Sequence, residues 1–176
     1  MSNGPQPEVW LRGPVDGVPA LLQPVAHALL QCREEVTASV SGLTSEQIWA
    51  QPSGVASIGF HVRHAAGSLD RLFTYARGER LSPDQRAALA AEAHPDLAPN
   101  VSARLLAAFD ETVERALEQL RTTSETTLLD FRGVGRAQLP STVLGLLFHA
   151  AEHMQRHAGQ IATTTRVVSA QASDAA

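Results

Sequence analysis

Four long stretches of the chain repeat apolar residues at the spacing of one helix face, and this pattern restricts the fold more than any other feature. The third stretch is the clearest, because its apolar positions recur every four residues at Leu105, Phe109, Val113 and Leu117, one side of a helix. No long alternation of Val, Ile or Thr with polar residues occurs, so strands are not expected. The predicted helices span residues 18–39, 57–78, 100–121 and 141–168. Each apolar stripe needs facing stripes to bury it, so we expect an all-α four-helix bundle.

The connections between these helices contain shorter sequence signals for helix starts and bends. Thr44 and Ser82 are each followed three residues later by glutamine, which predicts a capping box and an additional short helix at both places. A proline at position 24 predicts a bend in the first long helix, and residues 122–140 are expected to form an irregular connection. The predicted organisation is an extended N-terminal arm over residues 1–15, a bundle domain over residues 16–168 and a disordered tail over residues 169–176.

Composition excludes several classes of function. The formal net charge of -4 comes without a Lys/Arg cluster, so a role in binding nucleic acid has no electrostatic support. No apolar run approaches the ~20 residues of a membrane span, and the first residues do not resemble a secretory signal. Cys32 is the single cysteine, which excludes an internal disulfide and a cysteine-rich metal site. We therefore expect a soluble, cytoplasmic protein without a membrane or nucleic-acid partner.

Five of the seven histidines fall in two short windows, one in the second predicted helix and one in the last. They are His61, His64, His149, His153 and His157. Side chains four residues apart stand one turn above each other on a helix, so two such imidazoles can bind one metal ion. A third ligand then has to come from a neighbouring helix.

Helix geometry ranks these candidates without settling the choice. At about 100° per residue, His157 lies just inside the apolar arc of the last helix and His153 just outside it, whereas His149 is turned further toward solvent. In the second helix the same projection places His61 nearer the apolar arc than His64.

Two segments resemble the DinB/YfiT-like superfamily of four-helix bundles that hold a divalent metal with three histidines. They read SIGFHVRHAAGSLDRLFTYARGE and LPSTVLGLLFHAAEHMQRHAGQI, and the resemblance extends over about residues 16–168. It implies one ligand from the HAAG stretch, His64, and two from HMQRHAGQ, His153 and His157, with His61 and His149 as alternates. Many members have arginine where this chain has Ala158, so a role of that arginine does not transfer.

The resemblance further implies a metal-dependent enzyme, because three protein ligands leave positions open for water or substrate. Superfamily members include S-transferases that use low-molecular-weight thiols and presumed hydrolases. The expected cofactors are one divalent ion, zinc or nickel first and iron or manganese next, together with a small thiol for a transferase. The alternative is a non-catalytic, dimeric bundle that binds metal or a small ligand in a stress-related role, and a homodimer is expected in either case. A third interpretation makes every histidine structural or exposed.

Four other residues are candidates for supporting roles. Arg71 and Tyr75 follow His64 on roughly the same helix face, where they can contact a small-molecule substrate or a thiol that bears a carboxylate. The alternative is a surface ion pair for Arg71 and packing at a helix end for Tyr75. Glu152 and Gln160 are candidates to orient the ligand imidazoles through the second ring nitrogen, with Glu152 equally consistent with a solvated surface charge.

Overall fold

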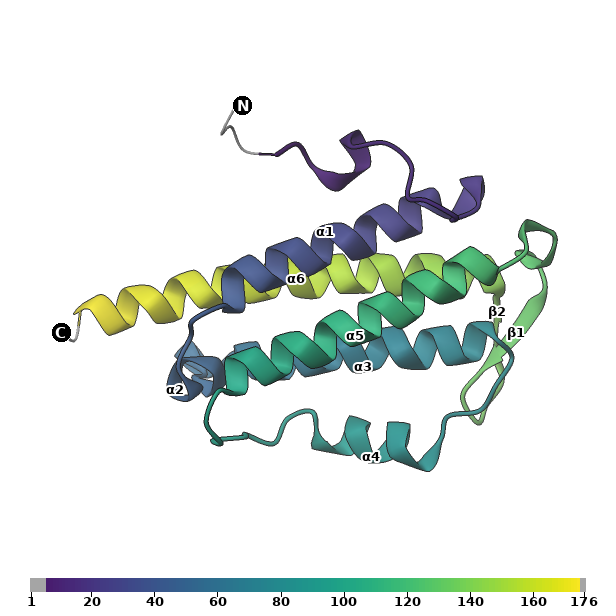
Figure 1. The fold of residues 1–176 in the computed structure, drawn as a ribbon. Helices are drawn as coiled ribbons and strands as arrows, with labels where there is room; N and C mark the ends of the chain where they lie inside the picture. Colours follow the sequence, from purple (N-terminus) through teal and green to yellow (C-terminus); the bar gives the residue numbers. More distant parts are fainter. Residues whose placement is uncertain (1–5, 175–176) are drawn as a thin grey trace.

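Four long helices form the bundle in the computed structural model, which describes residues 6–174 (Figure 1). Helix α6 packs against α1 and α3, and α5 packs against the same two helices. The apolar stripes of all four meet in one core, which confirms the predicted all-α four-helix bundle. The long helices are α1 (Gln23–Val40), α3 (Ile58–Ala76), α5 (Val101–Thr122) and α6 (Val143–Asp174).

The core is built from the residues that carry the helical periodicity. Phe109, Leu117, Leu69, Leu147 and Met154 are all at most 2% exposed, and together they represent α3, α5 and α6. Helix α1 contributes Cys32 among others, and burial raises the pKa of its thiol to about 12. The cysteine is therefore a small, unreactive core residue.

The capping signals are found where they were predicted. Thr44 begins α2 (Ser45–Trp49) and Ser82 begins α4 (Pro83–Ala91), each with a reciprocal capping box to the glutamine three residues on. Ser57 Oγ accepts from the Phe60 N–H at the start of α3, and Thr142 Oγ1 accepts from the Gly145 N–H at the start of α6. Each of these oxygens satisfies a backbone donor that has no partner within its helix.

Two expectations, one about the first helix and one about the end of the chain, need correction. Pro24 does not bend α1, because the helix begins at Gln23 and holds the proline in its first turn, where its missing N–H costs nothing. A short 3-10 turn (Ala20–Leu22) precedes it. Residues 169–174, predicted as tail, continue α6, because they contain no glycine or proline to stop the helix. Residues 175–176 of that tail lie outside the described part.

The predicted arm is described from residue 6 onward and is docked on α1, whereas residues 1–5 lie outside the described part. A 3-10 turn (Val9–Leu11) buries Val9, and the Val9 N–H donates to Gln31 Oε1 at 3.0 Å. Arg12 forms a two-point ion pair with Glu34 further along α1. The arm is thus held by polar contacts that helical periodicity does not predict.

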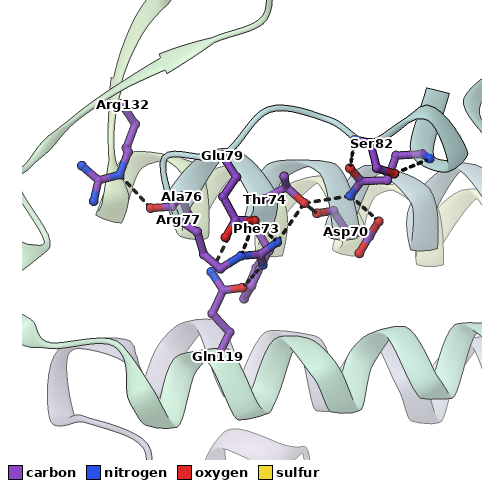
Figure 2. Close-up of polar contacts among 10 residues, drawn as sticks. Asp70, Phe73, Thr74, Ala76, Arg77, Glu79, Ser82, Gln119 and Arg132 are labelled. Carbon is purple, nitrogen blue, oxygen red and sulfur yellow. Dashed lines mark hydrogen bonds and ion pairs between the residues drawn. The ribbon is translucent and has the colours of Figure 1, made fainter.

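A two-stranded hairpin replaces part of the connection that was expected to be irregular. Strand β1 (Phe131–Val134) pairs antiparallel with β2 (Leu139–Thr142). Arg132 Nε donates to the Ala76 carbonyl at 2.8 Å, so the hairpin is attached to the C-terminal end of α3 (Figure 2). The same end of α3 accepts a hydrogen bond from Gln119 of α5 at the Phe73 carbonyl.

Helix α4 lies outside α3 and is held there by polar contacts (Figure 1). None of its residues Pro83–Ala91 is buried. Gln85 Nε2 donates to Asp70 Oδ2 at 2.6 Å and to Thr74 Oγ1 at 2.7 Å, near the Ser82 cap drawn in Figure 2. Residues of α3, α4 and α5 line a cavity of about 410 Å³. The residue that follows α4, Glu92, is nevertheless buried and reaches α3.

None of the helices in residues 6–174 is long and apolar enough to cross a membrane.

Candidate metal centre

Helices α3 and α6 share the most extensive contact of any two elements in the described chain, and four histidines meet between them. His61 and His64 come from α3, and His153 and His157 come from α6, one turn apart on each helix. Nε2 of His64 lies 3.1 Å from Nε2 of His153, and Nδ1 of His61 lies 3.0 Å from Nδ1 of His157. Opposing helices therefore bring ring nitrogens face to face.

Within this group His64, His153 and His157 offer ring nitrogens that all lie within 4.8 Å of one another. Nitrogens bound to one ion at 2.0–2.1 Å lie about 3–4 Å apart, so a small inward rotation of the imidazoles is enough to close on a cation. Nδ1 of His153 is in addition buried without a hydrogen-bond partner among the described residues. The donor set fits a single divalent ion such as zinc, nickel, iron or manganese.

Three of these imidazoles, those of His61, His153 and His157, have lowered pKa values, which favours their neutral form. Burial, followed by the neighbouring rings of His153, His64 and His61, lowers the pKa of His157 to about 4. Burial and then His64 lower the pKa of His153, and burial and then His64 lower that of His61. Since imidazole binds a metal through an unprotonated nitrogen, the lowered pKa values of these three rings favour metal binding at neutral pH.

The lowered pKa values predict a pH dependence of folding in the metal-free protein. The unfolded chain binds protons at an ordinary histidine pKa of ~6.5, whereas folded His157 does so only near pH 4. The contribution of neutral His157 to the stability of the folded state is therefore fully present above pH 6.5. It is lost as the pH drops from about 6.5 to 4.

Melting temperatures measured across this range with chelator present check this prediction. They are expected to fall more steeply for the wild type than for the His157→Gln variant. Parallel curves for the two proteins contradict it.

Glu92 is the residue at this site that sequence reasoning missed. The residue is 5% exposed, with Oε2 2.7 Å from Nδ1 of His64 and Oε1 2.7 Å from a guanidinium nitrogen of Arg71. Gly67, one turn after His64, leaves the space that this contact needs, because a Cβ there would lie 2.7 Å from both Arg71 and Glu92. An isolated acidic residue after a short helix gives no sequence signal for such a role.

Arg71 is buried in an ion pair with Glu92, a partner that sequence reasoning did not name. Its predicted contact with a substrate carboxylate stays a prediction. Tyr75 is half-buried and packs against the hydrophobic core, which agrees with the alternative that it packs at a helix end.

The remaining candidates lie on the outer side of α6. His149 is exposed and its Nδ1 lies 2.7 Å from Glu152, which also pairs with Arg156. Glu152 therefore contacts the histidine outside the close triad. Gln160 is exposed and lines a cleft.

This cleft has a volume of about 820 Å³ and lies between α6 and the segment before α3. His61 forms part of its wall, and the His61 ring contacts His157, so the cleft reaches the histidine cluster through one side chain. Arg156, Gln160 and Thr163 supply polar groups, whereas Val55 and Val167 supply apolar surface. The cleft is thus suited to a small molecule with both kinds of group.

Comparison with known proteins agrees with this architecture. The family model described as the DinB superfamily matches residues 28–161. The chain belongs to the DinB superfamily. A solved structure of a conserved protein from Enterococcus faecalis has the same fold, with a TM-score of 0.68 at 17% sequence identity over 84% of this chain and 96% of that one. Among the curated proteins, none matches this chain. The sequence resemblance to the superfamily is therefore confirmed, and the two histidine segments that carried it are the ones that face each other between α3 and α6.

Proposed function

We propose that this DinB-superfamily protein is a metal-dependent enzyme that holds one divalent ion with His64, His153 and His157. The observation that carries the proposal is the convergence of these three ring nitrogens within 4.8 Å beside a cleft. Three imidazoles leave coordination positions for a reactant, as in catalytic metal sites. Zinc and nickel are the foremost candidates for the ion, followed by iron and manganese.

The chemistry proposed is S-transfer from a low-molecular-weight thiol, or hydrolysis. When bound, the ion supplies a Lewis acid that activates a thiol as thiolate or a water as hydroxide. Burial lowers the pKa of His153 and His157 and so favours their neutral form, and α3 and α6 fix the relative positions of the three ligands. The cleft binds the substrate next to His61. Arg156, which also pairs with Glu152, is the charged group in its wall, and Val55 and Val167 contact an apolar group of the substrate.

A non-catalytic function is the second candidate, and the composition of the cleft favours it. The described residues that line the cleft include no carboxylate and no cysteine, so protein groups offer little acid or nucleophile chemistry beyond hydroxyls and His61. In this version the protein is a homodimeric bundle that binds metal or a small ligand in a stress-related role. A homodimer and a cytoplasmic location belong to the proposal in both versions.

A turnover screen distinguishes the two versions. Metal-loaded protein is incubated with electrophiles and several small thiols, and separately with esters and amides. The enzyme version predicts turnover that chelator abolishes and that one metal restores. His149→Ala is the matched control, because it removes an exposed imidazole from the same helix, and it is expected to retain the activity. Full metal occupancy without turnover of any of these substrates supports the binding version.

A further inference from the structure

We propose that Glu92, at the end of α4, is a positioning residue that makes His64 a metal ligand by fixing its proton on Nδ1. This inference rests on the proposed metal site and deepens it. It makes the site depend on three residues outside the ligand set, Glu92, Arg71 and Gly67.

The contacts of Glu92 define the tautomer of His64. An ionised carboxylate only accepts hydrogen bonds, so the 2.7 Å contact between Oε2 and Nδ1 of His64 places the proton on Nδ1. The lone pair of His64 is then on Nε2, which is the nitrogen that lies 3.1 Å from Nε2 of His153. The ring therefore presents its free lone pair toward the other two histidines of the triad.

Arg71 pairs with this carboxylate and holds it in place. The guanidinium binds Oε1 at 2.7 Å while Oε2 faces His64, so each oxygen of Glu92 has one partner. The side chains of Arg71 and Glu92 are 11% and 7% exposed, and a buried carboxylate needs such a partner to stay charged. Gly67 completes the arrangement, because any side chain there would displace one of the two charged groups.

The placement of Glu92 also ties the site to α4. That helix buries none of its own residues and is held by Gln85 at its start and by Arg63 at its end. Arg63 donates to the carbonyls of Ala91 and His94 on either side of Glu92. Anchoring on both sides fixes the backbone from which the carboxylate reaches into α3.

The Glu92→Gln variant tests the role most sharply. Arg71 has only donors, so the amide introduced by this substitution has to turn its oxygen to Arg71 and its nitrogen to His64. Nδ1 of His64 then accepts a hydrogen bond, and the proton moves to Nε2, where it blocks the lone pair that faces His153. We expect the affinity for Co²⁺, followed by its absorption spectrum, to fall about 10- to 100-fold, the usual effect of losing such an orienting partner.

Glu152→Gln is the matched control, because it removes a carboxylate that makes the same 2.7 Å contact with Nδ1 of a histidine outside the triad. Its Co²⁺ affinity is expected to stay close to that of the wild type. Equal affinities for Glu92→Gln and Glu152→Gln, with the wild type binding Co²⁺, overturn the role of Glu92 and leave the metal site standing. A wild type that binds no Co²⁺, or a His153→Ala variant that binds it equally well, refutes the metal site instead.

The tautomer of His64 gives a second test that needs no metal. The result for the wild type alone decides it. Nitrogen-15 NMR of the metal-free wild type at pH 8 is expected to show His64 protonated on Nδ1, and the Glu92→Gln variant to show it protonated on Nε2. Protonation of wild-type His64 on Nε2 overturns the proposal. A carboxylate that serves only to neutralise Arg71 does not move this signal.

Discussion

Alanine in place of His64, His153 or His157 is expected to reduce the affinity for a divalent metal more than about 100-fold, beyond the effect of losing an orienting partner. Each variant removes one of three nitrogens that converge within 4.8 Å, and the ion is then left with only two protein ligands. Titration of the metal-free proteins with Co²⁺ or Zn²⁺ measures the effect. Thermal unfolding of the same samples establishes that each variant is folded.

Two matched controls separate ligand loss from the loss of any nearby imidazole. His149→Ala removes an exposed ring, and His61→Asn removes a buried ring that contacts His157 without belonging to the triad. Both are expected to bind close to one equivalent of metal. If His61→Asn loses the metal and His64→Ala retains it, the ligand from α3 is His61 and the assignment is wrong.

Replacement of Arg71 by methionine is expected to lower the free energy of unfolding by about 3–5 kcal/mol, because it leaves the carboxylate of Glu92 buried without its cation. The measurement is denaturant unfolding of the metal-free protein at pH 8, where unperturbed imidazoles are neutral. The loss is expected to exceed that of Glu92→Gln, which removes the buried charge and keeps a group of the same shape.

The double variant Arg71→Met/Glu92→Gln tests whether the two side chains act together. Neutralising Glu92 removes the cause of the destabilisation, so the double variant is expected to be more stable than Arg71→Met alone, with a coupling of about 1–3 kcal/mol. Additive losses contradict an energetic link between the 2.7 Å contact and the fold.

Most of the fold could be predicted from local sequence patterns, because residues close in sequence determine where helices form and end. The four-residue spacing of apolar residues and the capping boxes at Thr44 and Ser82 are visible in the sequence and recur in the structure. The hairpin is different, since four-residue strands are too short for an alternation to stand out. It is held partly by Arg132, which bonds to a carbonyl 56 positions earlier in the chain.

At the candidate site, too, some features follow from the local sequence and others depend on contacts between distant residues. Helix geometry correctly indicated that His61 is more buried than His64, but it cannot tell which ring faces α6, because that depends on how two helices pack. The family motif named His64, and the structure brings His64 together with His153 and His157. Glu92 lies 28 positions from His64 and follows a helix with no buried face, so no periodic pattern connects the two.

The metal content of untagged protein is the most direct test of the central claim. Elemental analysis of wild-type protein purified without a histidine tag and without added metal is predicted to find close to one divalent ion per chain. The His153→Ala protein prepared in parallel is predicted to contain almost none. Wild-type protein that contains no metal and fails to take up zinc, nickel, iron or manganese on reconstitution contradicts the account, as does equal metal content in the two proteins.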